Sequence, residues 1–140
     1  MARVLCLLLT CFCLAACTVC PAEWTSVGSK CYRPLRTFMT WQEAQGNCSS
    51  MQGRLPEITN SEDNKSLKDL IYKQKLELSW LGFVRQSGEW KYLSNKEKIT
   101  FSDWRPDYDN GNCSVTSPHD KWWPFSCYIT RTNVVCEYVK

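Results

Sequence analysis

The chain begins with an apolar run that differs from everything after it. Residues 1–3 carry one positive charge, residues 4–16 are almost all apolar, and Ala15, Ala16 and Cys17 are small. This layout is typical of a secretory signal peptide, and it predicts a signal at residues 1–17 with cleavage near residues 16–19. A bacterial lipoprotein box at residues 14–17 is the alternative. The run is shorter than the roughly 20 residues that span a bilayer, so we expect a secreted, extracellular protein without a membrane span.

Two later segments have the spacing of amphipathic helices. Thr40 and Glu43 form a capping box before a helix that runs to Cys48, and Gly53 is the expected stop. A second helix is predicted over residues 62–75, after a cap at residue 60 or 61. Its inward positions share helical spacing and are Leu67, Leu70 and Ile71.

The other apolar positions alternate or form short runs, which indicates strands. We expect a hairpin within residues 20–32 and strands at 79–84, 90–93, 99–101, 112–116 and 133–138. The Pro, Asp, Asn and Gly residues between Trp104 and Cys127 predict mostly loop. Two helices followed by antiparallel strands make an α+β domain over residues 20–140.

Cysteine usage places this domain in an oxidising compartment. Six of the ten cysteines follow the apolar run, at Cys20, Cys31, Cys48, Cys113, Cys127 and Cys136. An even set of six in a short secreted chain predicts three disulfides, and composition alone leaves fifteen possible pairings.

Charge and catalytic chemistry exclude other classes. The formal net charge of +3 falls to about +2 without Arg3, which gives no argument for a nucleic-acid partner. His119 is the only histidine, and the chain has no hydrolase motif, so we expect no enzyme.

The residues resemble the long form of the C-type lectin-like domain over residues 20–140. The family's core motif is matched by Trp80-Leu81-Gly82-Phe83, its first helix by Trp41, Glu43, Ala44 and Cys48, and its approach to the long loop by Trp104 and Pro106. The resemblance implies two helices packed on antiparallel sheets with a long loop region. It also implies the disulfides Cys20–Cys31, Cys48–Cys136 and Cys113–Cys127.

The family's calcium chemistry is not matched. Sugar-binding members hold calcium in the long loop with several oxygen ligands. This chain has Arg105-Pro106-Asp107, Gly111 and Trp122-Trp123-Pro124 at the corresponding positions. Arginine only donates hydrogen bonds and is permanently cationic, and Gly111, Trp123 and Pro124 have no side-chain oxygen. Only Asp107 remains as a weak candidate ligand, so we expect no calcium cofactor in the family's geometry.

Two features of the loop are candidate ligand-binding elements. Its oxygen-bearing residues would form a shifted calcium site if they converged, although Asp and Asn are also common in turns: Asp107, Asp109, Asn110, Asn112 and Asp120. Trp123 with Tyr108 would form a flat apolar surface that stacks on sugars or anchors a protein, if both are exposed. Trp122, and with it Phe125, is expected to pack in the core.

Three glycosylation sequons are present, at Asn47, Asn64 and Asn112. Two of them have a cysteine in the middle that is expected to be bridged. We therefore expect Asn64, on the polar face of the second helix, to be the best candidate.

Together these patterns predict a binding module for a glycan or an extracellular protein. All six cysteines after the signal are used, which favours a monomer or a non-covalent oligomer. The alternatives are a calcium-dependent lectin with a shifted oxygen cluster, and a structural or material-binding protein that acts on mineral, ice or a haemostatic partner.

Overall fold

The computed structural model describes residues 19–139. The predicted signal peptide and most of its cleavage region lie outside the described residues. In chain order the elements are β1 (Thr25–Val27), β2 (Lys30–Leu35), α2 (Trp41–Ser50), β3 (Gly53–Arg54), α3 (Ser61–Lys73), β4 (Ser79–Gln86), β5 (Glu89–Tyr92), β6 (Cys113–Thr116), β7 (Trp123–Phe125) and β8 (Val134–Tyr138).

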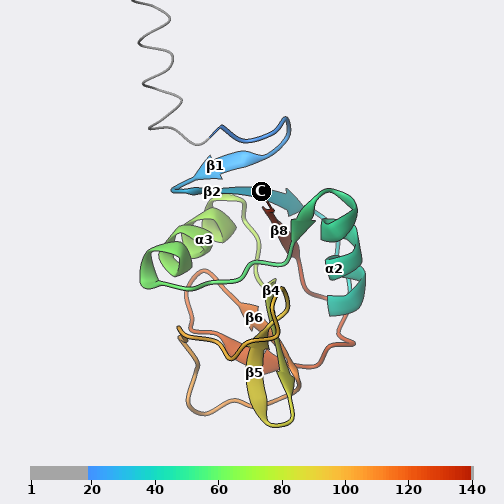
Figure 1. The fold of residues 1–140 in the computed structure, drawn as a ribbon, viewed down its shortest axis with the longest axis vertical. Helices are drawn as coiled ribbons and strands as arrows, with labels where there is room; N and C mark the ends of the chain where they lie inside the picture. The colour runs from blue at the N-terminus through green and yellow to red at the C-terminus, as the bar shows by residue number, and fades with distance from the viewer. Residues whose placement is uncertain (1–18, 140) are drawn as a thin grey trace, which may run out of the picture.

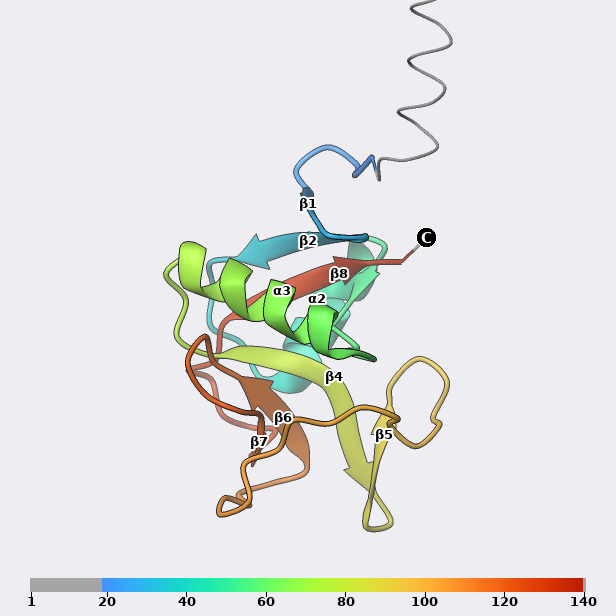
Figure 2. The same ribbon diagram turned by 90° about the vertical axis from the view of Figure 1, so that its left-hand side faces the viewer.

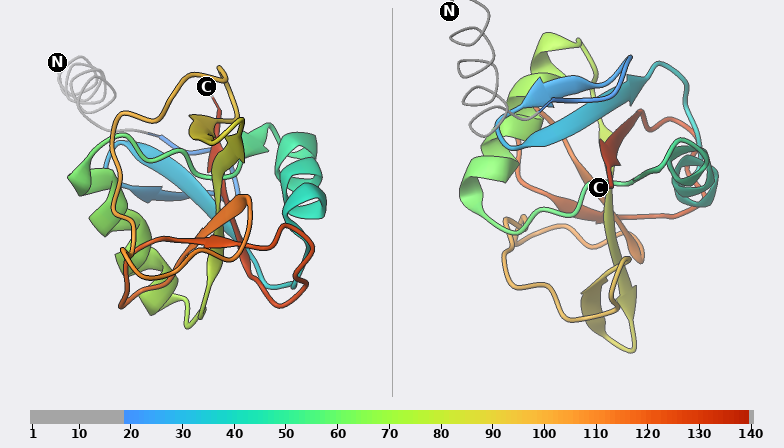
Figure 3. Two further views of the ribbon diagram at one scale, coloured as in Figure 1. Left: turned by 90° about the horizontal axis from the view of Figure 1, so that it is seen from below. Right: turned by 45° about the horizontal axis from the view of Figure 1, so that its top comes forward.

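The strands form two four-stranded antiparallel sheets. Their orders are β1-β2-β8-β3 and β5-β4-β6-β7. The first sheet joins the two ends of the chain, because β2 pairs with β8 and places Tyr32 opposite Glu137. Figure 1 and Figure 3 show α2 and α3 on opposite sides of β8, and Figure 2 shows the second sheet extending away from the first. This is the predicted α+β architecture.

The first helix starts as its sequence predicts and ends differently. Thr40 accepts a hydrogen bond from the Glu43 amide, and Glu43 accepts one from the Thr40 amide, so the capping box is complete. The helix ends at Ser50, and Gly53 is not its stop but the first residue of β3. A β-carbon on Gly53 would lie 2.8 Å from the Trp24 ring and 2.9 Å from the Glu137 carbonyl oxygen. Glycine is therefore used for close packing of β3.

The core is rich in aromatic residues and forms two clusters, each of which contains residues from both sheets. Trp80, Phe83 and Trp122 are fully buried. The indole nitrogen of Trp80 donates to the Met39 carbonyl at 2.8 Å, so this buried polar atom is satisfied. The second helix, capped by Asn60, contributes its three predicted inward residues to the same core.

Three disulfides join the elements as the family resemblance implies. They are Cys20–Cys31, Cys48–Cys136 and Cys113–Cys127. The second ties α2 to β8 across 88 positions, and the third frames the long loop and β7.

Two strand predictions need correction. Residues 99–101 are not a strand, because the Thr100 amide donates to the Tyr92 hydroxyl at 3.1 Å instead of to a neighbouring strand. Conversely, β7 lies inside the segment predicted as mostly loop. Its central residue, Pro124, has no amide proton to donate, and proline is tolerated here because β7 is the edge of its sheet.

The buried carboxylate of Glu137 is the centre of a charged network in the first sheet. Glu137 is 2% exposed and accepts from Lys30 at 2.7 Å and from Arg54 at 2.8 Å. Lys30 also lies 3.3 Å from Asp63 of α3, so this network links the sheet to the helix. Burial, with the nearby Glu137 charge, raises the pKa of the Tyr32 phenol well above its ordinary value.

No helix between residues 19 and 139 has the length and apolarity that a membrane crossing requires.

Candidate functional site

The long loop is anchored by a short parallel contact between its two arms. Trp104 and Trp122 form an isolated bridge, with the Arg105 amide donating to the Trp122 carbonyl at 2.8 Å. Successive side chains of an extended arm point in opposite directions. Trp122 accordingly enters the core as expected, while Trp123 is only half-buried and lies on the side of Arg105. The bridge thus fixes which side chains reach the loop surface.

Arg105 organises the first half of the loop. Its guanidinium donates to Asp120 at 3.1 Å and lies 3.6 Å from Asp107. The same group lies 5.5 Å from the centre of the Tyr108 ring and 5.7 Å from that of Trp123, which is cation–π range. We call Arg105, Asp107, Tyr108, Asp120 and Trp123 the Arg105 cluster. One cation therefore holds two carboxylates and two aromatic rings together.

Arg85 organises the second half of the loop from strand β4. Both of its terminal nitrogens donate to the Asp109 carboxylate, at 2.7 and 3.1 Å. It also donates to the Gly111 carbonyl at 2.7 Å and to the Asn112 amide oxygen at 3.1 Å. This hydrogen bonding by Arg85 lowers the pKa of the Asp109 carboxyl below its ordinary value and raises that of the Arg85 guanidinium. We call these contacts the Arg85 clamp.

Gly111 shows why a side-chain ligand cannot stand at its position. A β-carbon there would lie 2.3 Å from the Phe125 carbonyl oxygen, and its φ is +153°. Backbone packs directly against backbone at this point, so any larger residue would push the loop away from β7.

In the structure the five oxygen-bearing residues of the shifted-site alternative do not form one group. Asp107 and Asp120 face Arg105, whereas Asp109 and Asn112 face Arg85. Asn110 is exposed, and its amide reaches only the Tyr108 hydroxyl, at 3.4 Å. Among residues 19–139, no three His, Cys, Asp or Glu side chains gather as metal ligands would.

The predicted flat aromatic surface also needs correction. Tyr108 and Trp123 do lie together, with ring centres 6.1 Å apart, but their planes meet at 80°. Arg105 packs against both rings. The two rings therefore form an aromatic corner that contains the Arg105 guanidinium, and they do not form a flat surface.

A hollow of about 720 Å³ lies beside Arg105. Its walls are mainly charged and include Lys68, Asp103, Asp120 and Lys121. Lys68 and Asp103 are themselves paired at 3.1 Å. Paired charges of this kind present both donors and acceptors, which is the requirement for binding a polar, hydroxyl-rich molecule.

Asn64 is buried, which corrects its expected place on the polar face of the second helix. It is 8% exposed. Its amide oxygen accepts from the Trp122 indole at 2.8 Å, and its amide nitrogen donates to Asp103 at 2.9 Å. The side chain joins α3 to the loop, and a glycan on its nitrogen would break that contact. Asn47 and Asn112 are the exposed sequon positions.

Arg85 is a residue of the candidate site that sequence reasoning missed. Arg105 stood out because it occupies a family ligand position, but Arg85 lies at an ordinary outward position of a predicted strand end. No local pattern connects it with residues 109–112, which follow more than 20 positions later. Only strand pairing between β4 and β6 brings them together.

Comparison with known proteins identifies the class. The family model "Lectin C-type domain" matches residues 37–138, so the chain belongs to the C-type lectin domain family. A perlucin-like protein of Mytilus galloprovincialis is 28% identical over 127 residues, covering 84% of this chain and 81% of that protein.

Two solved structures show how different the ligands of similar folds are. The cow carbohydrate-recognition domain of CD23, solved in the presence of a GlcNAc2Man3 oligosaccharide, is 25% identical with a TM-score of 0.73, covering 89% of this chain and 98% of that one. A calcium-independent type II antifreeze protein is also 25% identical, with a TM-score of 0.72, covering 85% of this chain and 93% of that one.

Proposed function

We propose that this C-type lectin-like domain is a secreted, non-enzymatic binding module that recognises a glycan or an extracellular protein through the Arg105 cluster, without calcium. The observation that carries the proposal is the position of the Arg105 guanidinium. It lies among carboxylates and aromatic rings, in the segment where sugar-binding members of the family place calcium ligands.

The electrostatic argument follows from what Arg105 and Arg85 neutralise. Asp107 and Asp120 face one guanidinium, and Asp109 faces the other. A divalent cation entering the loop would have to displace an arginine that is covalently part of the chain. The loop therefore has its cations built in, and its order does not depend on a bound metal.

The surface chemistry supports a polar ligand with an apolar face. The half-exposed rings of Tyr108 and Trp123 supply contact area, and the neighbouring hollow supplies donors and acceptors. Sugars have both features, since their ring carbons present an apolar face and their hydroxyls bond to charged side chains. Protein partners use the same aromatic and arginine anchors.

A glycan array with calcium and then with a chelator tests this function, together with a Trp123→Ala variant. We expect equal binding in both conditions, and about tenfold weaker binding for Trp123→Ala with little loss of stability. Tyr128→Ala is the matched control, because Tyr128 is a fully exposed aromatic that makes no contact with the cluster. Binding that requires calcium, or a melting temperature that rises by several degrees with calcium, would contradict the calcium-free mechanism.

Secretion is supported by the apolar run at residues 1–17 and by the three disulfides. N-terminal sequencing of the product released from eukaryotic cells is expected to start at residue 17–20. A lipidated Cys17 would instead establish the lipoprotein alternative.

Material binding is the second candidate function. It is favoured by the likeness to a calcium-independent type II antifreeze protein. Thermal hysteresis measurements test the ice-binding form of this candidate, and silence on the glycan array combined with ice-growth inhibition would establish it.

A further inference from the structure

Two adjoining grooves lie at the C-terminal end of α3, and the larger one borders the hollow beside Arg105 at His119. The larger, of about 600 Å³, lies between the helix end and residues 117–119, and the smaller, of about 310 Å³, is bordered by Arg36, Phe38 and Asn133. Both are lined by residues 75–77, so this short segment forms a ridge between them. We call them the ridge grooves.

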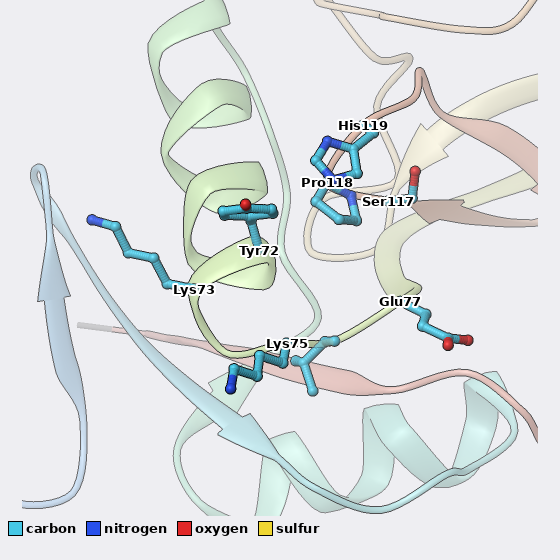
Figure 4. Close-up of a pocket in the computed structure, with 8 residues that line it drawn as sticks. Tyr72, Lys73, Lys75, Glu77, Ser117, Pro118 and His119 are labelled. Atoms are coloured by element: carbon cyan, nitrogen blue, oxygen red, sulfur yellow. The ribbon is translucent and has the colours of Figure 1, made fainter.

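Each groove has an exposed aromatic side chain at its edge. Tyr72 is 61% exposed and Phe38 is 60% exposed. In Figure 4 the Tyr72 ring extends from the last turn of α3 toward Pro118 and His119 across the larger groove. The side chains of Leu76 and Pro118 also line this groove. Large exposed aromatics beside a hollow are typical of the anchor points of protein interfaces.

The margin of the grooves is cationic. Arg36, Lys73 and Lys75 are at the border, against one carboxylate, Glu77. Figure 4 shows that the Lys73 and Lys75 side chains leave the helix end on the side away from His119. The lysine charges therefore border one side of the apolar centre and do not fill it. A partner with the complementary arrangement has an apolar side chain flanked by carboxylates.

The grooves are held in place by specific contacts. Arg36 donates to the Gln74 carbonyl at 3.1 Å and to the Gln74 side-chain oxygen at 2.6 Å. Lys75 has a φ of +58°, and the following Leu76 amide donates to the Ile71 carbonyl at 3.0 Å. Tyr72 packs edge-to-face with His119 at 5.2 Å. A preformed surface loses less entropy on binding than a flexible one.

We propose that the ridge grooves bind an acidic segment of a protein partner, with an aromatic or aliphatic side chain entering beside Tyr72 and its neighbouring carboxylates directed at Lys73, Lys75 and Arg36. This site adjoins the hollow beside Arg105, because His119 lines both, but its anchor residues Tyr72, Leu76 and Phe38 lie outside the Arg105 cluster. A sulfated glycan fits the charge but not the centre, because Leu76, Phe38 and Pro118 offer no hydrogen bonds to sugar hydroxyls.

The test uses short synthetic peptides as defined probes. One has a central Phe flanked by Asp residues, a second has Lys in place of each Asp, and a third has Ser in place of Phe. A sulfated heparin oligosaccharide is the fourth probe. Binding is followed by amide resonance shifts of the isotopically labelled full domain at low and at high ionic strength.

We expect the acidic Phe peptide to bind and to shift the resonances of Phe38, Tyr72, Leu76 and Ser117. Tyr72→Ala should weaken this binding about tenfold, the size of a single anchor residue. The double change Lys73→Glu and Lys75→Glu should weaken it about tenfold at low ionic strength and less at high. Glu77→Lys should strengthen it several-fold, a gain that general loss of structure cannot produce.

Tyr128→Ala and Trp123→Ala are the controls, and neither should change peptide binding. The proposal is overturned if the acidic peptide does not bind, if the Lys or Ser peptide binds equally well, or if the sulfated oligosaccharide alone binds at these residues. Loss of peptide binding in Trp123→Ala would also overturn it, because the peptide would then occupy the Arg105 cluster.

Discussion

The Glu137 network and the Arg85 clamp use the same chemistry in opposite surroundings. In each, arginine donates to a carboxylate at 2.7 to 2.8 Å. The Glu137 side chain is 2% exposed and closes a sheet, whereas the Asp109 side chain is 62% exposed and holds a loop. A buried carboxylate that loses its partners is costly, while an exposed one returns to water.

This difference distinguishes the first sheet, which a buried carboxylate holds together, from the long loop, which an exposed one holds. In the first sheet, loss of Lys30 and Arg54 would leave the Glu137 carboxylate buried without a cation. The long loop is held by exposed pairs whose individual energies are small, so its residues can change without endangering the fold.

The largest expected effect is the loss of the buried carboxylate. Glu137→Ala should lower the free energy of unfolding by about 3 kcal/mol, because Lys30 and Arg54 lose their shared partner inside the first sheet. Denaturant unfolding measures this. Asp107→Ala is the matched control and should cost at most about 0.5 kcal/mol, since this carboxylate is exposed. Equal losses for the two variants would contradict the comparison.

An intermediate effect is expected at the residue that joins the two regions. Asn64→Leu should lower stability by about 1–3 kcal/mol, because the buried Trp122 indole loses its acceptor and Asp103 loses a donor. The wild-type chain expressed in eukaryotic cells should carry no glycan at Asn64. Mass spectrometry of the glycosidase-treated protein checks this, and an occupied Asn64 in folded protein would contradict the buried placement.

A smaller effect on stability, but a local one on mobility, is expected for the Arg85 clamp. Arg85→Ala should cost less than about 1 kcal/mol while hydrogen exchange at residues 109–112 becomes markedly faster. Exchange in β2 and β8 should stay unchanged. Faster exchange throughout the domain would show that the clamp is part of the global structure.

The smallest effect is a dependence on acid. The pKa of Asp109 is lowered in the folded protein, so its contribution is fully present above the ordinary carboxyl pKa of about 4 and is lost as the pH falls through the lowered value. Exchange at residues 109–112 should therefore accelerate only below about pH 4 in the wild type. In Asp109→Asn this acceleration should be absent, and its persistence would assign it to another group.

The elements with strong local signals were predicted correctly, and the contacts between distant segments were not. The capping box at Thr40 and Glu43 and the spacing of Leu67, Leu70 and Ile71 involve neighbours in sequence, so both helices were found. The strand β7 was missed because its only support is pairing with β6. Asn64 was placed on the wrong face because its partners, Asp103 and Trp122, are 39 and 58 positions away.

The sequence by itself determined the class of this protein. Helix caps, apolar spacing and six cysteines are local or compositional features, and together with the residues at Arg105 and Gly111 they also indicated that the family's calcium ligands are missing. Only the tertiary structure decided what replaces them. Arg85 and Arg105 divide the loop's oxygens between two cations, and the ridge grooves bring Phe38, Tyr72 and Pro118 onto one face. These arrangements depend on distant chain segments that sheet pairing brings together. The periodic pattern of apolar residues within a segment does not show which other segment it will contact.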